Sequence, residues 1–429
     1  MSDKRVVVVG TTADYIDIIS TRFPGRALFV TDHRERAAAV ESPPDSASEV
    51  LCDLSDFEEV GSALRLQLMR WRIKPIGIAC FDCESMSLAA YLADLYELPY
   101  PGAGAIAAAR DKCRSKQLWR GCGLPTPAVR TGQELSDAVS FMAETGGPVV
   151  LKPTTGSGSE LVFVCRNRDE LSLAFTTMTV RLKNHSNARM YPRDAVGRIA
   201  MEEYVAGDEY SCDFVLDGNR VDIIRIARKV FAAGHPVGTT LAYVVPSDLP
   251  EGLERSALAD QFRRAAVALG IDRAVCMIDF IVRGGRAVML ELTPRPGGDC
   301  LPPLIRLSGG LDMLGLTLDF AEGIYPALPP PSRWRRLAGA RIIADQAGMV
   351  RQIDSRQAMA DSRVLEVYLK RRPGHEVVLP PEDYDSRILG HVIFAPSATT
   401  AVEAEANELI GMVRVDMEAP RWATPQALS

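Results

Sequence analysis

Two acidic residues, a threonine and an arginine in the second half of the chain have the types and spacing of a phosphate-handling metal site. Asp279 lies inside the apolar run 275–281, and Glu291, Thr293 and Arg295 follow at intervals of two residues. Because side chains alternate between the two faces of a strand, these last three project to the same side. Carboxylate and hydroxyl oxygens suit Mg²⁺ that bridges nucleotide phosphates, and an arginine can hold a phosphoryl or carboxylate group with paired hydrogen bonds.

The turn between the two strands decides whether Asp279 joins that face. A loop with an odd number of residues places Asp279 on the side of Glu291. A two-residue turn at 284–285 pairs Asp279 with Leu290 instead and puts the two carboxylates on opposite faces. The metal site therefore requires the odd loop. A buried ion pair between Arg295 and one of the acids is the alternative, because such pairs also occur in cores without a catalytic role.

A lysine followed by a glycine- and serine-rich loop is a second candidate for phosphate binding. Lys152 closes an apolar run, and the loop 154–159 contains Gly156, Ser157 and Gly158. Backbone amides exposed in such a loop can bind phosphate oxygens. The residue order differs from that of a P-loop, and a strand-like run follows instead of a helix, which disfavours a P-loop NTPase. A flexible hairpin is the alternative interpretation.

The segment 201–211 carries residues suited to holding a nucleoside. Glu202, Tyr204, Val205 and Glu209 place hydrogen-bond acceptors beside an apolar wall on a strand that leads into a turn. Small-molecule sites are commonly apolar with a few polar groups at the edge. Taken alone, the segment fits an ordinary amphipathic strand equally well.

Composition favours a metabolic enzyme. The 429 residues carry a net charge of −6 and are 47% hydrophobic, which disfavours a nucleic-acid-binding surface. No apolar stretch approaches the about 18–20 residues of a membrane helix, and no secretory pattern precedes the first apolar run. Nine cysteines, an odd number, favour reduced thiols. We therefore expect a cytoplasmic protein, and we interpret the lone C-x-x-C string at 80–83 as structural because no second pair lies at ligand spacing.

Alternating strand-like and helical patterns organise the chain. The apolar runs 6–9, 27–30 and 76–80, with a helical period at 85–95, predict a parallel α/β sheet. A single helix is expected over 105–119, and strands and helices continue to about residue 325. A proline cluster at 326–331 marks a boundary, and the short strands beyond it predict a small α+β domain. The predicted fold class is α/β and α+β multidomain.

In this order, the three candidate segments resemble the ATP-grasp superfamily, and Arg110-Asp111-Lys112 adds a further match. The resemblance covers about residues 5–325. It implies a Rossmann-like pre-ATP-grasp domain (1–108), an ATP-grasp domain (109–325) made of a lid subdomain (about 125–205) and a larger α+β subdomain, and a C-terminal α+β domain (330–429). Gly234-His235, the Pro-Arg-Pro-Gly-Gly run at 294–298 and the tail after Pro331 look most like the L-amino-acid ligases, which form dipeptides.

For ATP, the resemblance implies three groups of contacts. Lys112 and Lys152 match two lysines that contact the phosphates. Ser157 and the amides of Gly156 and Gly158 match the mobile loop that closes over the β- and γ-phosphates. The nucleoside residues are Glu202 for the adenine amino group, Tyr204 and Val205 for the adenine edge, and Glu209 for the ribose.

For the metal and the transferred phosphoryl group, the resemblance implies Asp279 and Glu291 as magnesium ligands and Arg295 as the stabilising arginine. Arg228 or Lys229 matches a further basic residue near the γ-phosphate, and the sequence does not choose between them. Thr293 replaces the asparagine that is usual as a third ligand, so the number of bound Mg²⁺ ions, one or two, is left open. Mn²⁺ can substitute for Mg²⁺ in the expectation from the family.

The implied activity is that of an ATP-dependent carboxylate–amine ligase. A carboxylate attacks the γ-phosphate, giving ADP and an acyl phosphate, which an amine then attacks. Amides near Gly297 and Gly298 are candidates for binding the oxyanion, and His235 is a candidate base or wall of the amine pocket, although a lone histidine is more often structural. Asp299 is the candidate partner for a substrate ammonium group, with capping of a turn or helix as its alternative.

Other members of the superfamily remain as alternatives. A biotin-carboxylase-like or purine-pathway enzyme would need a more basic pocket for a small anion, whereas the runs 232–234 and 302–304 suggest an apolar side-chain pocket. A non-catalytic ATP-binding module is disfavoured by the presence of Arg295 and both acids. The expected partners are small-molecule carboxylates and amines, without nucleic acid or membrane, and a homodimer is left open.

Overall fold

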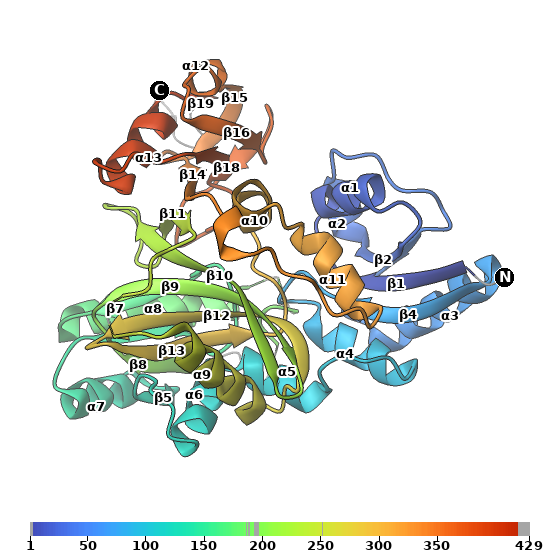
Figure 1. Cartoon of the computed structure of the whole chain (residues 1–429). Coiled ribbons are helices and arrows are strands. Elements are labelled where there is room, and N and C mark those ends of the chain that lie inside the picture. The colour runs from blue at the N-terminus through green and yellow to red at the C-terminus, as the bar shows by residue number, and fades with distance from the viewer. Residues whose placement is uncertain (1–2, 186, 188, 193–196, 251, 419–429) are drawn as a thin grey trace, which may run out of the picture.

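The N-terminal part of the chain is a parallel sheet with helices on both faces (Figure 1). The computed structural model describes residues 3–185, 187, 189–192, 197–250 and 252–418. The strand order is β3-β2-β1-β4. The elements are β1 (Asp3–Val9), α1 (Ala13–Arg22), β2 (Ala27–Asp32), α2 (His33–Ala38), β3 (Glu49–Cys52), α3 (Phe57–Trp71), β4 (Ile73–Ala79), α4 (Met86–Leu95) and α5 (Ala103–Arg110).

The first strand shows why this sheet needs a cover on each face. Val6 and Val8 pack with α1 and with α11 (Met313–Ala321), whereas Val7 and Val9 pack with α3 and α4. A parallel strand buried on both faces reads as a continuous apolar run. The carboxyl ends of β1, β2 and β4 therefore meet at one edge, the edge at which open α/β sheets bind ligands.

A small antiparallel sheet follows, in the order β5-β8-β6-β7. Helices α7 and α8 pack on it through a cluster that includes Phe141, Leu171, Phe175 and Met178. The elements of this part are α6 (Lys112–Gly121), β5 (Val129–Gly132), α7 (Leu135–Thr145), β6 (Val149–Pro153), β7 (Phe163–Cys165), α8 (Arg168–Lys183) and β8 (Ile199–Glu203).

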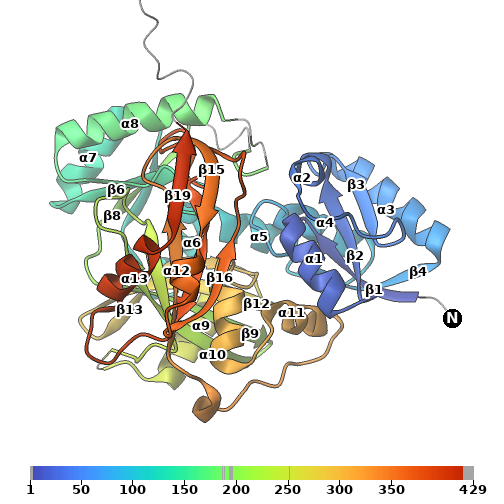
Figure 2. The same cartoon turned by 90° about the horizontal axis from the view of Figure 1, so that it is seen from above.

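The largest sheet has eight strands in the order β13-β12-β9-β10-β11-β14-β18-β16. The C-terminal strands β14, β18 and β16 thus extend the sheet begun by the central part of the chain, and only β17, β15 and β19 form a sheet of their own. From above, the C-terminal strands lie between helices α7 and α8 and the N-terminal sheet (Figure 2). The domain boundaries expected from the sequence stay predictions.

The remaining elements complete the chain. They are β9 (Asp208–Asp217), β10 (Arg220–Phe231), β11 (Thr240–Val245), α9 (Arg255–Ala268), β12 (Arg273–Arg283), β13 (Arg286–Thr293), α10 (Leu301–Gly309), η1 (Pro331–Arg333), β14 (Leu337–Ile343), β15 (Gly348–Asp354), α12 (Arg356–Met359), β16 (Val364–Leu369), β17 (Glu376–Val377), β18 (Ile388–Phe394), α13 (Val402–Gly411) and β19 (Arg414–Glu418).

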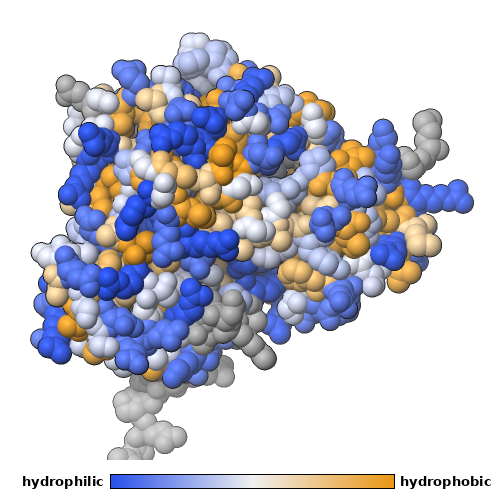
Figure 3. Space-filling view, turned by 90° about the horizontal axis from the view of Figure 1, so that it is seen from below, coloured by the Kyte–Doolittle hydropathy of each residue, from blue (hydrophilic) through white to orange (hydrophobic). Residues whose placement is uncertain are grey.

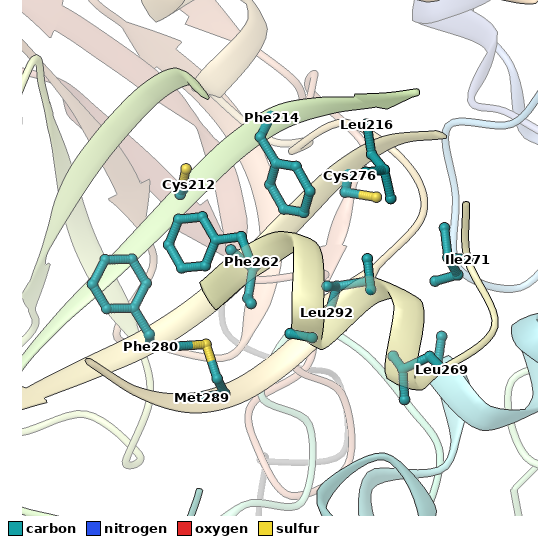
Figure 4. Packing of buried hydrophobic residues seen from close by; sticks show 14 of the residues in the cluster. Cys212, Phe214, Leu216, Phe262, Leu269, Ile271, Cys276, Phe280, Met289 and Leu292 are labelled. Carbon is teal, nitrogen blue, oxygen red and sulfur yellow. The ribbon is translucent and has the colours of Figure 1, made fainter. Parts of the chain in front are cut away.

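The core beneath the large sheet is aromatic. Phe262 of α9 packs between Phe214 of β9 and Phe280 of β12, with ring centroids 5.6 and 5.4 Å apart (Figure 4). All three rings are fully buried. Such aromatic pairs add to the free energy gained by area burial, so β9 and β12 are held firmly against α9 on one face. Val215 and Val275, on the other face of these strands, pack with α10 and α11.

The structure differs from the sequence predictions at two helical segments. The single helix predicted over 105–119 is wrong, because Asp111 leaves helical geometry (φ −87°, ψ 108°) and its carboxylate caps α6 by accepting from the amides of Cys113 and Arg114. Helix α8 was missed, although Asn167 caps it and its buried residues recur at helical spacing.

The predicted α/β and α+β multidomain class is confirmed by the sheets and by the likeness to solved structures reported below. On the face seen from below, hydrophilic and hydrophobic residues are interspersed (Figure 3). None of the helices in the described ranges combines the length and apolar composition that a bilayer crossing requires.

Candidate active site

A β-bulge in the hairpin β12–β13 brings Asp279 and Glu291 opposite each other. The turn of this hairpin is two residues long, so the odd loop that the metal site required is absent. The register shifts after Asp279, however, and Leu290 is left over, so that Asp279 pairs with Glu291. One extra residue in a strand changes the face on which later residues project. The bulge therefore has the effect that an odd loop would have had.

Lys116, which was not singled out from the sequence, holds this bulge. Its Nζ donates a hydrogen bond of 2.5 Å to the carbonyl of Leu290, and its side chain is fully buried. The neighbouring Met289 exchanges hydrogen bonds with the segment before the small sheet, at Pro125 and Thr126. The signal for Lys116 was its position four residues after Lys112, which places both on one side of α6.

The oxygens on the face of Asp279 fit a bound cation. Asp279 Oδ1 and Thr293 Oγ1 are buried and have no hydrogen-bond partner. Thr293 shares the face of Glu291 because it lies two residues further along β13. Within the described ranges, no group of three or more histidine, cysteine, aspartate or glutamate residues has metal-binding geometry. A cation here would therefore rely on two carboxylates, one hydroxyl and ligand or water oxygens, an all-oxygen set that suits Mg²⁺.

Of the two basic candidates on β10, Lys229 lies in the site. Its Nζ is 2.6 Å from Glu209 Oε1 and 2.7 Å from Asp279 Oδ2. Burial acts to lower the pKa of Lys229, but Asp279 and Glu209 outweigh burial and raise it. Arg228 projects to the other face because side chains alternate, and it pairs across the strands with Tyr210. Lys229 thus places a positive charge beside the acidic pair.

Glu202 is already bound to two ammonium groups. Its carboxylate lies 2.9 Å from Lys116 Nζ and 2.7 Å from Lys152 Nζ. Burial lowers the pKa of Lys116 to about 8, whereas Glu202 keeps the pKa of Lys152 raised despite burial. The two lysines also lower the pKa of Glu202 against the effect of its burial. The resemblance implied an acid facing adenine, and it did not indicate this cluster.

The glycine- and serine-rich loop is tied to the acidic pair through Lys112. Lys112 Nζ donates to the carbonyl of Gly156 at 2.8 Å and lies 3.6 Å from Glu291 Oε2. Gly156 has a φ of +126°, and an added Cβ would lie 3.2 Å from the Tyr191 ring, so this position favours glycine. Ser157 and Gly158 follow in the same loop, which therefore lies beside the candidate phosphate site.

The residues implied for the nucleoside lie at the junction of β8 and β9. Tyr204 is 43% exposed, and its amide donates to the carbonyl of Pro148 at 3.1 Å. Val205 is buried, and Glu209 is engaged by Lys229. The segment thus has a buried apolar residue beside the acidic cluster, and its nucleoside-binding role stays a prediction.

Arg295 is held by Cys83, which the sequence interpretation treated as structural. Two guanidinium N–H groups donate to Cys83 Sγ at 2.9 and 3.0 Å, and a third donates to the carbonyl of Pro296. Cys83 follows β4 at the carboxyl edge of the N-terminal sheet, so this contact joins that sheet to the end of β13. All nine cysteines are free thiols.

The amide of Gly297 is not available to a reaction intermediate. It donates to Asp213 Oδ1 at 2.8 Å, and Asp213 forms a fully buried ion pair with Arg225 at 2.7 Å. An added Cβ on Gly297 would lie 2.9 Å from an Arg225 nitrogen. The expected oxyanion role is therefore wrong for this amide, and Gly298 is left as the candidate. Asp213 and Arg225 instead hold the loop that follows Arg295.

Asp299 is neither uncommitted nor a helix cap. Its Oδ2 lies 2.6 Å from Arg341 Nε on β14, and its side chain is 28% exposed. The N-cap of α10 is Cys300, which has no side-chain cap bond. Burial opposes ionisation of Asp299, but Arg341 outweighs it and lowers the pKa. A substrate at this position would meet an ion pair and not a lone acid.

The remaining sequence candidates lie elsewhere. His235 Nδ1 lies 3.1 Å from Arg387 Nη1, and burial, followed by that positive charge, lowers the pKa of His235. It therefore packs toward the C-terminal part of the chain. In the run 302–304, Leu304 is fully buried in the core between α10 and the large sheet, and the apolar pocket expected from this run and from 232–234 stays a prediction.

Comparison with known proteins places these observations in a family. Residues 145–303 match the family model described as an ATP-grasp domain. The D-alanine–D-alanine ligase of Aromatoleum aromaticum is 31% identical over 241 residues, which cover 54% of this chain and 72% of that ligase. The chain belongs to the ATP-grasp family. This ATP-grasp protein is also 30% identical to protein y4rH of Sinorhizobium fredii over 71% of the chain, but the match spans only 61% of that relative's length.

Solved structures share the fold of this ATP-grasp protein. The L-amino acid ligase from Bacillus licheniformis superposes with a TM-score of 0.76 at 19% identity, covering 97% of this chain and 100% of that one. The biotin carboxylase domain of the Hydrogenobacter thermophilus 2-oxoglutarate carboxylase, in complex with MgADP and bicarbonate, gives 0.66 at 17% identity, covering 97% and 91%. At these identities the likeness concerns the fold.

Proposed function

We propose that this ATP-grasp protein joins a carboxylate to an amine through an acyl phosphate and releases ADP and phosphate. The observation that carries the proposal is the pairing of Asp279 with Glu291 among lysines. Burial acts to raise the pKa of Glu291, but the surrounding lysines outweigh it and keep the carboxylate charged. The lysines are Lys112, Lys152, Lys116 and Lys229. Carboxylates for a cation beside ammonium groups for phosphate oxygens are the parts that phosphoryl transfer uses.

Each group has a separate task in this reaction. Asp279, Glu291 and Thr293 would hold Mg²⁺, which offsets the charge of the phosphates when it is bound. Lys112 and Lys152 contact the phosphate oxygens, and Lys229 offsets the charge that builds on the transferred group. Arg295, fixed by its hydrogen bonds to Cys83, orients the carboxylate and steadies the acyl phosphate.

Water must be kept from the acyl phosphate, because hydrolysis would waste it. The loop with Gly156, Ser157 and Gly158 is suited to this task, since its carbonyl contact with Lys112 draws it toward the phosphate site. Closure of such loops over bound substrates is common in enzymes with reactive intermediates. Among the described candidates, Gly298 is left to bind the oxyanion that forms when the amine attacks.

Amino acids are the substrates that this site suits best. The ion pair of Asp299 with Arg341 offers a carboxylate to an ammonium group and a guanidinium to a carboxylate, so its charges complement the two charges of an amino acid. The names of the relatives support the same class, since one is a D-alanine–D-alanine ligase and another an L-amino acid ligase.

A pairwise screen tests this proposal. The protein is incubated with ATP, Mg²⁺ and pairs of amino acids, and phosphate release is measured against each amino acid alone. Release that requires a pair supports the ligase. Release with bicarbonate and with no pair would move the protein to a carboxylase-type reaction, and tight nucleotide binding without release under any condition would make it an ATP-binding module.

A further inference from the structure

His391, on one of the C-terminal strands, lies on the same face of the large sheet as the candidate site. Across the large sheet, Lys229 pairs with Tyr243 on β11, and Arg341 on β14 pairs with His391 on β18. Tyr368 on β16 pairs with His391 in turn. Residues directly opposite each other on antiparallel strands project to the same face. Tyr243 pairs with Gly339 on β14, and Arg341 projects to the same side because it lies two residues further along that strand. The face that carries the acidic pair therefore continues through Arg341 to His391.

His391 has a buried nitrogen without a hydrogen-bond partner. The residue is 7% exposed, and its Nε2 lacks a partner. The nearest acid, Glu366, lies 3.8 Å from that nitrogen, beyond hydrogen-bond reach, and is held by Arg306 at 2.9 Å. Leaving a buried polar atom unpaired costs free energy, so an imidazole nitrogen kept this way is a candidate for binding a ligand.

The N-terminal part of the chain approaches His391 through helix α1, which contacts Tyr368. Tyr368 stacks near His391, with ring centroids 5.2 Å apart, and its hydroxyl donates to Asp14 at 3.2 Å. Asp14 lies in the first turn of α1, at the carboxyl edge where Cys83 holds Arg295. The titratable and charged groups next to His391 are Arg341 and Tyr368, opposite it on the neighbouring strands, and the acids Glu366 and Asp299. Behind them, Arg306 holds Glu366 and Asp14 accepts from Tyr368.

We infer that His391, with Glu366 beside it and Asp14 behind Tyr368, forms the acceptor subsite and takes the proton of the attacking amine. This inference rests on the proposed ligase activity. An amine is protonated at neutral pH and cannot attack until it loses a proton, and the two carboxylates attract the ammonium form. Histidine is the side chain whose ordinary titration lies near neutrality, which suits it to accept that proton.

One N–H proton of the ammonium passes to the imidazole, and the freed lone pair forms the C–N bond with the acyl carbon. The bond from that carbon to the phosphate oxygen breaks, and the phosphate leaves with its electron pair. The departing phosphate takes the second proton of the nitrogen, so that an amide, hydrogen phosphate and a protonated imidazole result.

Two acceptors separate this role from a structural one. A mixture of the twenty common L-amino acids is incubated with ATP and Mg²⁺, with and without excess hydroxylamine, which is uncharged at neutral pH and needs no base. Dipeptides are measured by mass spectrometry and hydroxamate by its iron complex. His391→Gln should lower dipeptide formation about 100-fold or more, while hydroxamate formation changes less than about threefold.

Further variants keep the result interpretable. Glu366→Gln retains the imidazole and should lower dipeptide formation about tenfold, and His33→Gln, on an exposed residue, should change neither product. Equal losses of both products, or no loss of either, would overturn the role of His391. Absence of hydroxamate from the wild type would overturn the ligase itself.

Discussion

Asp279 lies directly opposite Glu291 across a hairpin whose turn has two residues, and the displaced Leu290 makes this possible. Without the bulge the two carboxylates would point to opposite faces. The carbonyl of Leu290 is held by Lys116, which also binds Glu202. The acidic pair and the buried lysine cluster are therefore connected, because Lys116 fixes the strand geometry that places both carboxylates on the metal face.

Removing either acid of the metal face should abolish turnover and leave the fold intact. Asp279→Asn and Glu291→Gln preserve volume but remove a charge from the candidate cation site, so phosphate release should fall at least about 100-fold. Thr293→Asn should retain activity, because it exchanges one neutral oxygen ligand for another. The measurement is phosphate release as a function of Mg²⁺ concentration. Near-native activity of either acid variant at limiting Mg²⁺ would refute the assignment of that ligand.

Lys229 and Arg228, neighbours on β10, give a matched pair of variants for testing which residue faces the phosphates. Lys229→Met should lower kcat about 100-fold, since Lys229 is the residue that contacts Asp279 and Glu209. Arg228→Met should change kcat by less than about threefold, because Arg228 projects to the other face. Steady-state kinetics at saturating ATP distinguishes the two variants. The reverse order of effects would mean that Arg228 faces the phosphates.

Glu202→Gln should destabilise the protein by about 3–5 kcal/mol, since it leaves Lys116 and Lys152 buried without their acid. The matched control is Glu203→Gln, next to it but 37% exposed on its side chain, which should cost at most about 1 kcal/mol. Urea unfolding of the three proteins at neutral pH measures the difference. Equal stabilities would show that the cluster adds nothing to the fold.

The same carboxylate makes stability depend on pH. The pKa of Glu202 is lower in the folded protein than the ordinary value of 4.5, so the folded state binds fewer protons than the unfolded state. The contribution of Glu202 is therefore fully present above about pH 4.5 and is lost as the pH falls through the folded pKa. Glu202→Gln should flatten this part of the stability profile.

The contact between Arg295 and Cys83 predicts a second effect on catalysis. Cys83→Ala removes the acceptor of two guanidinium hydrogen bonds and should lower kcat about 10- to 100-fold through misplacement of Arg295. Cys83→Ser keeps an acceptor and should recover most of the activity. Cys122→Ser, on an exposed cysteine, is the control. An unchanged kcat in Cys83→Ala would mean that Arg295 needs no such support.

The sequence predicted the parts of this site better than their connections. The acids, the lysines and Arg295 have residue types and intervals that alternate along strands, so local periodicity was sufficient to single them out. The bulge at Leu290 is set by contacts with Lys116, 174 residues away in sequence, and no local pattern records it. For the same reason the ion pair of Asp299 with Arg341 and the contact of Cys83 with Arg295 were missed.

The fold, too, was predicted only in part from the sequence. Apolar runs identified the central strands of the N-terminal sheet because those strands are buried on both faces. The joining of β14, β18 and β16 to the sheet of β9 and β12 depends on strand pairing between distant segments. Composition at the proline cluster marks a change in the chain, but it does not show that the two sides share one sheet.

The identity of the nucleotide product tests the central claim most directly. The protein is incubated with ATP, Mg²⁺, the amino-acid mixture and hydroxylamine, and the nucleotides are separated by ion-exchange chromatography while hydroxamate is measured in the same sample. Transfer of the γ-phosphoryl group to a carboxylate predicts ADP and phosphate in equal amounts, matched by the sum of the hydroxamate and the dipeptides. AMP and pyrophosphate as the products would contradict the acyl-phosphate mechanism and the role given to Asp279, Glu291 and Arg295.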